Sequence, residues 1–156
     1  MEPGSRHTGY GAIETDGRSH RLLEKGTLTP PSRADLPARL RFVHAGIAEL
    51  IRRLRPSVLA VEDVFHSTNA RSALILGHVR GVILLAGAEA MIPVRAFSPA
   101  TVKVEVTGFG RAEKAQVALM VERILGLTGS GEAGDAADAL AVALCHAHLH
   151  GVGELS

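Results

Sequence analysis

The spacing of hydrophobic residues predicts a chain that alternates between strands and helices. Apolar and polar residues alternate loosely over residues 8–14 and again over 22–28, and Asp16-Gly17 between them predicts a hairpin turn. A continuous apolar run over residues 58–62 predicts a strand that is covered on both faces, and residues 93–97 predict a second short strand. These segments predict two antiparallel strands followed by strands that alternate with helices.

Apolar residues recur at intervals of three and four over the rest of the chain, which predicts helices. The expected helices cover residues 35–55, 69–90, 99–107, 114–125 and 135–148. The last of these contains Cys145 within an Ala- and Leu-rich pattern, which indicates a small core residue. Two antiparallel strands followed by alternating helices and strands predict an α/β fold with a sheet of mixed direction.

Composition narrows the class of protein. With 156 residues and 46% hydrophobic residues, the chain is long and apolar enough for one folded domain, expected over residues 1–150 with a short tail at 151–156. We expect no membrane span, no export signal and no disulfide framework, and therefore a cytoplasmic protein. A net charge of +1 and 3% aromatic residues mean that any contact with a polyanion must come from a local patch.

Acidic residues stand at the ends of predicted elements. Glu62 and Asp63 follow the buried strand directly, and ligands of open α/β sheets bind at the carboxyl ends of such strands. The alternative is that both acids are only the solvated end of a strand. Asp135 and Asp138 lie three residues apart, so they share a face in the first turn of the last helix, where the helix dipole favours ionised acids. The alternative for this pair is simple capping of the helix by Asp135.

Glu2, in a Pro-Gly turn, is the third acidic element. Carboxylates from three distant segments, each at the end of an element, suit a phosphodiester-cleaving site with two metal ions, because Mg²⁺ prefers oxygen ligands and retains waters for the remaining positions.

Four segments in order resemble the RuvC crossover-junction endodeoxyribonucleases. They are Glu-Pro-Gly-Ser-Arg-His-Thr-Gly-Tyr-Gly at residues 2–11, Glu-Asp-Val-Phe at 62–65, Ala-Glu-Lys-Ala-Gln-Val at 112–117 and Asp-Ala-Ala-Asp-Ala-Leu-Ala at 135–141. The resemblance covers essentially the whole chain. It implies a ribonuclease H-like mixed sheet flanked by helices, and a Mg²⁺-dependent homodimer. Its expected activity is symmetric nicking of two like-polarity strands of a Holliday junction in DNA recombination and repair, in partnership with the RuvA and RuvB branch-migration proteins.

Carried over position by position, the resemblance places the catalytic and metal-binding acids at Glu2, Glu62, Asp135 and Asp138, with two Mg²⁺ ions expected and Mn²⁺ as a substitute. It makes Phe65 the aromatic that stacks at the crossover, with core packing as the alternative role. The remaining residues expected to contact DNA, each of which is otherwise a solvated surface residue, are Asn69, Arg71, Lys103, Arg111 and Lys114.

Two departures from the family pattern stand at the N-terminus. The family has Asp where this chain has Glu2, one methylene longer, which is expected to weaken metal placement. The family's first acid follows a short apolar strand in the middle of the sheet, and no such strand stands ahead of Glu2, so we expect this strand to be missing, most simply through a misassigned start. These departures leave two other functions open: a junction-binding module without cleavage, and a ribonuclease H-like RNA-processing nuclease of the YqgF type.

Two further features carry expectations. Small residues at four-residue intervals in the second helix, Ala73, Gly77 and Gly81, would allow a helix of a second copy to approach closely, with packing inside the chain as the alternative. Three histidines near the C-terminus, at 146, 148 and 150, are expected on the surface.

Overall fold

The computed structural model describes residues 1–4, 6–63, 69–128 and 134–151. The elements in chain order are β1 (Thr8–Thr15), β2 (His20–Leu28), α1 (Leu36–Leu54), β3 (Leu59–Glu62), α2 (Ala70–Glu89), β4 (Val94–Phe97), α3 (Pro99–Thr107), α4 (Lys114–Leu125) and α5 (Asp135–His150). Every strand and helix expected from the sequence is present. The largest differences are at β2, which begins two residues earlier, and at α5, which continues two residues further.

Local capping explains why the helix boundaries were predictable. The Asp35 carboxylate accepts a hydrogen bond from the Ala38 N–H at 2.9 Å and caps α1, which ends at Arg55 in a left-handed conformation (φ 48°) just before Pro56. The Asn69 side chain caps α2 in the same way by accepting from the Arg71 N–H at 2.9 Å.

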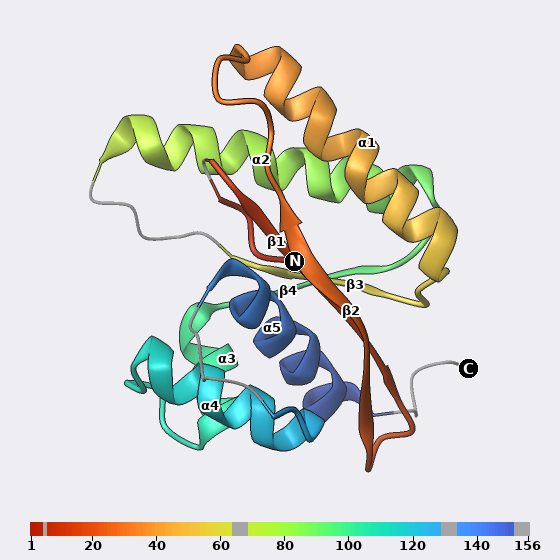
Figure 1. Cartoon of the computed structure of the whole chain (residues 1–156), viewed down its shortest axis with the longest axis vertical. Coiled ribbons are helices and arrows are strands. Elements are labelled where there is room, and N and C mark those ends of the chain that lie inside the picture. The colour runs from red at the N-terminus through yellow and green to blue at the C-terminus, as the bar shows by residue number, and fades with distance from the viewer. Residues whose placement is uncertain (5, 64–68, 129–133, 152–156) are drawn as a thin grey trace.

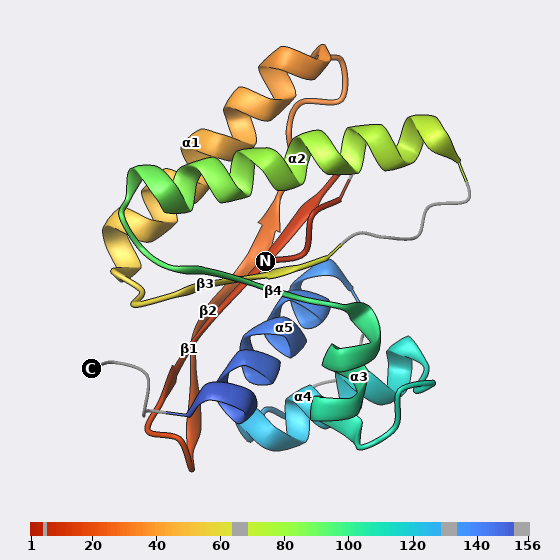
Figure 2. The ribbon, with the colours of Figure 1, turned by 180° about the vertical axis from the view of Figure 1, so that it is seen from behind.

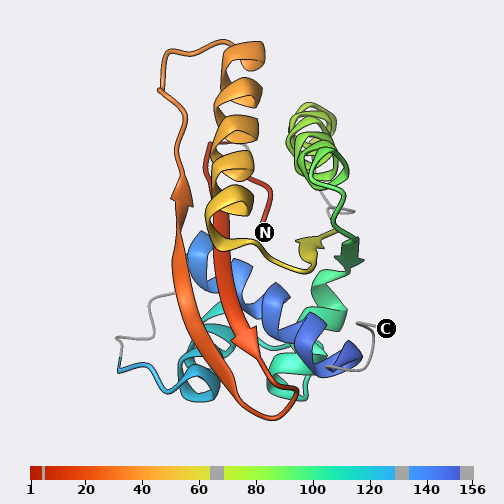
Figure 3. The same cartoon turned by 90° about the vertical axis from the view of Figure 1, so that its right-hand side faces the viewer.

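The strand directions agree with the prediction of a mixed sheet, but the strands form two separate pairs. β1 and β2 are antiparallel, whereas β3 and β4 are parallel, with Leu59 beside Val94 and Glu62 beside Phe97. No hydrogen-bonded ladder joins the two pairs within the described residues. Figure 3 shows the long β1–β2 hairpin on one side of the molecule and the short β3–β4 pair on the other.

The first two residues link the two strand pairs through backbone hydrogen bonds. The Met1 amino group donates to the Ala60 carbonyl at 2.7 Å, and the Glu62 N–H donates to the Met1 carbonyl at 3.1 Å. Glu2 and Gly9 exchange two backbone hydrogen bonds of 3.0 Å each. Met1 is buried, so the start of the described chain sits between the strand pairs where the resemblance places a central strand.

Helices cover the strands in two groups. α1 and α2 lie above the strands in Figures 1 and 2, and α3, α4 and α5 lie below them. The upper core joins Ile47 of α1 and Ile83 of α2 to Val61 of β3, all of which are at most 1% exposed. Burial of such side chains is worth about 1.5–3 kcal/mol each.

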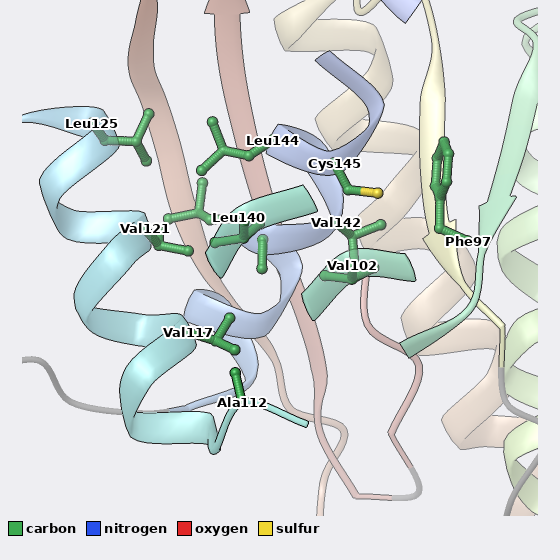
Figure 4. Packing of buried hydrophobic residues seen from close by; sticks show 12 residues of the cluster. Phe97, Val102, Ala112, Val117, Val121, Leu125, Leu140, Val142, Leu144 and Cys145 are labelled. Atoms are coloured by element: carbon green, nitrogen blue, oxygen red, sulfur yellow. The ribbon is translucent and has the colours of Figure 1, made fainter. Parts of the chain in front are cut away.

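α5 is the centre of the lower core (Figure 4). Its Leu140, Leu144 and Cys145 are fully buried, as expected for Cys145, and Val117 and Val121 of α4 pack against them. α5 also lies directly on β1: a Cβ atom on Gly11 would stand 2.5 Å from Leu140 Cδ2. A larger residue at position 11 would therefore push the helix away from the strand.

α2 differs from the expectation that no stretch is apolar enough to cross a membrane. An 18-residue window of this 20-residue helix has a mean hydropathy of 1.4, which suffices for a membrane span by length and composition, and 22% of that window is buried. Arg80 in the middle of the helix forms an ion pair with Asp63 at 2.5 Å. The helix thus combines one ion-paired arginine with an apolar surface that is largely exposed.

The expectation that the C-terminal histidines are surface residues holds only for His148, which is exposed and shares a hydrogen bond of 3.0 Å with the Glu105 carbonyl. His146 and His150 are half-buried, with ring centroids 4.8 Å apart. Both rings also pack against Phe97, at 5.9 and 6.0 Å. The prediction failed because α5 does not fray before His150 but continues along β4.

Candidate active site

The four acids predicted from the sequence lie at the ends of elements that meet at one edge of the strands. Glu2 pairs with β1, Glu62 is the last residue of β3, and Asp135 and Asp138 are in the first turn of α5. Two backbone contacts hold these ends together. The Glu62 N–H bonds to Met1, and Gly9 lies so close to α5 that a Cβ atom would stand 1.9 Å from the Asp135 carbonyl oxygen.

The charges of these carboxylates act on one another. The pKa of Glu2 is raised to about 8, first by burial and then by the negative charge of Asp138, with smaller contributions from Asp135 and Glu62. Burial and the charge of Asp138 also raise the pKa of Glu62. Asp135 therefore lies within electrostatic range of Glu2, and Asp138 within range of both glutamates, which is the convergence that a shared site requires.

The pair Asp135 and Asp138 does not cap its helix. The N-cap of α5 is Gly134, and no side-chain capping bond is present there among the described residues. The interpretation of Asp135 as a simple cap is therefore wrong, and both carboxylates lie in the first turn at the positive end of the helix dipole.

Lys114 is a member of this cluster that the sequence reading placed only among the DNA contacts. Its Nζ donates to Asp138 Oδ2 at 2.6 Å, and its positive charge lowers the pKa of both glutamates. The Glu113 N–H donates to Gln116 Oε1 at 2.8 Å in a capping box that starts α4 at Lys114. The segment Glu113-Lys114-x-Gln116 was recognised in the sequence as part of the family resemblance. Its residue types do not indicate that the Lys114 side chain points towards the acids.

The Met1 amino group is a further ionisable group near the acids that sequence reasoning missed. Burial lowers its pKa to about 5, although the charges of Glu62 and Glu2 act in the opposite direction. At neutral pH this group is largely uncharged, so it offsets little of the carboxylate charge.

The donor set fits a hard divalent cation. Lys114 interacts electrostatically with Glu2, Glu62 and Asp138, and Glu2 Oε2 is buried without a hydrogen-bond partner among the described residues. Within the same part of the chain, no three metal-ligating side chains are close enough to hold an ion together. The Lys114–Asp138 ion pair engages one of the four carboxylates, and a divalent cation would compete with the lysine for it.

The residues expected to contact DNA lie in different settings. Asn69 serves as the cap of α2, Arg71 and Arg111 are exposed, and Lys103 is close enough for its charge to lower the pKa of Glu62. Phe65 lies outside the described residues. Lys103 and Lys114 thus form the basic rim of the acidic cluster, with the arginines on the surface.

Comparison with known proteins identifies the family. The family model for the crossover junction endodeoxyribonuclease RuvC matches residues 1–146. The RuvC endonuclease of Halorhodospira halophila is 51% identical over 148 residues, covering 95% of this chain and 87% of that protein. That of Citrifermentans bemidjiense is 44% identical over 155 residues, covering 99% and 94%.

Solved structures agree with the sequence relatives. The structure described as Thermus thermophilus RuvC in complex with Holliday junction substrate superposes with a TM-score of 0.88 at 37% identity, covering 94% of this chain and 90% of that one. The yeast mitochondrial Holliday junction resolvase Ydc2 has a TM-score of 0.63 at 12% identity, covering 94% and 77%, and shows the shared fold alone. The order of the elements, the meeting of the four acids and these matches place the chain in the RuvC family of crossover junction endodeoxyribonucleases.

Proposed function

We propose that this protein resolves Holliday junctions by hydrolysing phosphodiester bonds in DNA at the acidic cluster. The observation that carries the proposal is the mutual approach of Glu2, Glu62 and the Asp135/Asp138 pair, in a chain whose relatives are crossover junction endodeoxyribonucleases. The same matches do not favour an RNA-processing enzyme or a binding module without cleavage.

The nucleases of this family depend on a metal, and the proposed ligands here are the four carboxylates, with two Mg²⁺ ions as the expected complement. A bound divalent cation would supply a more acidic water and stabilise the charge that develops on the phosphate. The carboxylates hold the cations and position the scissile bond between them. Glu2 carries a proton at neutral pH, given its pKa of about 8, and must release it from its carboxyl group before it can bind a metal.

The decisive test is Glu62→Gln. The amide keeps the size of the side chain but removes its negative charge, so we expect junction binding in Ca²⁺ to be retained and nicking in Mg²⁺ to fall by roughly 10²-fold or more. Glu49→Gln, which removes an exposed acid paired with Arg52 on α1, is the matched control and should nick normally. Retained nicking by Glu62→Gln would remove Glu62 from the site.

The substrate preference is proposed to be a four-way DNA junction, bound by Lys103, Arg111, Lys114, Asn69 and Arg71 with Phe65 at the crossover. Because contacts to phosphate release counterions, log affinity should fall linearly with log salt, with a slope of about −0.9 for each phosphate neutralised. Junction binding should exceed binding to a linear duplex or an RNA hairpin in the same assay. A junction affinity that does not change with salt concentration would contradict phosphate binding by the basic rim.

A homodimer is proposed from the exposed surface of α2. The exposed side of this helix carries three small residues, Ala73, Gly77 and Gly81. A Cβ atom added to either glycine would meet no other atom of the chain within 4 Å. Exposed Leu74 and Leu85 add apolar area to this surface, here called the α2 face. Two copies related by two-fold symmetry would present two acidic clusters to two equivalent strands, which is what symmetric nicking needs. Partnership with RuvA and RuvB stays a prediction.

A further inference from the structure

Phe109 is an aromatic residue that the fold leaves on the surface. It stands in the turn between α3 and α4 and is 58% exposed, whereas Phe97 is buried in the lower core. Single apolar residues are common on protein surfaces, so exposure alone assigns no role to this ring. The backbone that holds the ring and the charges around it carry the argument further.

The turn fixes both polar groups of the Phe109 backbone. The Phe109 N–H donates to the Thr107 hydroxyl at 3.1 Å, and its carbonyl accepts from the Ala112 N–H at 3.1 Å. The Thr107 hydroxyl in turn donates to the Lys103 carbonyl at 2.8 Å. Gly108 ends α3 in a left-handed conformation (φ 77°), and the buried Ala112 anchors the other end of the turn. The ring is therefore presented from a backbone that is ordered before any ligand binds, which lowers the entropy cost of binding.

The turn lies on the side of the molecule where the acidic cluster forms. In the sequence Phe109 stands between Lys103 and Lys114, the two lysines of the basic rim. Five residues of chain span at most about 17 Å, so Phe109 is within that distance of Lys114, whose Nζ contacts Asp138. Figures 1 and 2 show the turn on the same side as the end of β3 and the start of α5. DNA bound at the acidic cluster would therefore pass close to the ring.

The charges around the turn favour nucleic acid over protein as the ligand of Phe109. Arg111 is exposed two residues after it, so this stretch carries three basic side chains against two acidic ones, Glu105 and Glu113. The cores of protein–protein interfaces are depleted in lysine. An aromatic ring among lysines and arginines is instead typical of surfaces that bind single-stranded nucleic acid, where rings stack on bases of any sequence.

We infer that Phe109 stacks on a nucleobase that is unstacked near the branch point of the DNA junction. The inference rests on the proposed function and adds a second aromatic contact to the one proposed for Phe65. In a linear duplex each base is stacked between its neighbours, and taking a base out of the stack costs free energy. The contact therefore favours branched over linear DNA without any preference for sequence.

A tryptophan at this position would report the stacking directly. The sequence contains no tryptophan, so Phe109→Trp introduces a single fluorophore. Binding of a four-way junction in Ca²⁺ should quench its emission, because the indole ring then stacks on a base. Phe42→Trp, at a phenylalanine of α1 that is 41% exposed, is the matched control and should keep its emission. Unchanged emission of Phe109→Trp with the junction bound, or equal quenching by a saturating linear duplex, would overturn the inference.

Junction affinity provides the second measurement. Phe109→Ala should bind the junction roughly 5- to 150-fold more weakly than the parent, the loss expected for one stacked base. Phe109→Leu keeps an apolar side chain without the flat ring and should be nearly as weak, whereas Phe42→Ala should bind like the parent. Melting temperatures equal to that of the parent would show that the Phe109 variants fold.

The result that contradicts the affinity prediction is a Phe109→Ala variant that binds the junction as tightly as the parent. The proposed function fails differently, through a parent protein that does not nick junctions or a Glu62→Gln variant that still does. A parent that nicks, together with an unaffected Phe109→Ala, would overturn the stacking contact alone.

Discussion

At the scale of single residues, two buried ionisable groups at the N-terminus are expected to make the stability of the fold depend on pH. They are the Glu2 carboxyl group and the Met1 amino group. The pKa of Glu2 is raised from 4.5 to about 8, so the folded protein holds this proton more tightly than the unfolded chain. The contribution of Glu2 to stability is therefore complete below about pH 4.5 and is lost as the pH rises to about 8. The Met1 amino group has its pKa lowered from 8.0 to about 5, so its contribution is complete above pH 8 and is lost as the pH falls towards 5.

Glu2→Gln separates these two opposing effects. Without divalent ions, the variant should be more stable than the parent by an amount that grows from pH 5 to pH 8, reaching at least about 1 kcal/mol. Melting temperatures measured in EDTA across this range would show it. Glu14→Gln, which removes an exposed acid of β1 paired with Arg21, controls for the loss of one negative charge. A difference that shrinks as the pH rises would contradict the burial of the Glu2 carboxyl group.

At the scale of elements, the site depends on how closely α5 lies on β1. Gly9→Ala would place a Cβ atom 1.9 Å from the Asp135 carbonyl oxygen, a backbone atom that moves only if the helix moves. We expect this variant to lose about 2 kcal/mol or more of stability and to need more Mg²⁺ for nicking, because Asp135 and Asp138 are displaced. Chemical denaturation and a Mg²⁺ titration of nicking would measure the two effects.

Gly77→Ala in α2 is the matched control for that substitution. A Cβ atom there meets no atom of the same chain within 4 Å, so at a dilution where the protein is monomeric the variant should gain roughly 0.5–1 kcal/mol from the lower entropy of the unfolded chain. If Gly9→Ala were as well tolerated as Gly77→Ala, the close contact between β1 and α5 would not be what positions the aspartates.

At the scale of the whole molecule, the α2 face is an exposed apolar surface of the kind that a second copy could cover. Leu85, which is 51% exposed, lies on this face beside the exposed Gly81, and we expect Leu85→Arg to shift the protein from dimer to monomer in sedimentation experiments. Leu119→Arg, at a leucine that is 46% exposed on α4, is the matched control and should leave the dimer intact. A parent protein that sediments as a monomer at tens of micromolar would contradict paired incision of two strands.

The sequence by itself determined the elements and singled out the four acids that we propose for the site. Hydrophobic periodicity and the caps at Asp35 and Asn69 are local signals, because they depend on residues within one or two turns of each other, and the helices follow them closely. The four acids were identified from the segments that resemble the RuvC family. A motif records which residue types stand at the ends of elements, even though the sequence does not show which of these ends meet in space.

The tertiary structure alone decided what depends on contacts between distant residues. It separated the expected mixed sheet into two pairs, turned Lys114 onto Asp138 from 24 positions away, and packed His146 and His150 against Phe97. A periodic pattern reports which face of an element is buried, but not which partner buries it or which charge a flexible lysine meets. For that reason the sequence could propose the acids one by one, whereas their electrostatic coupling emerged only from the fold.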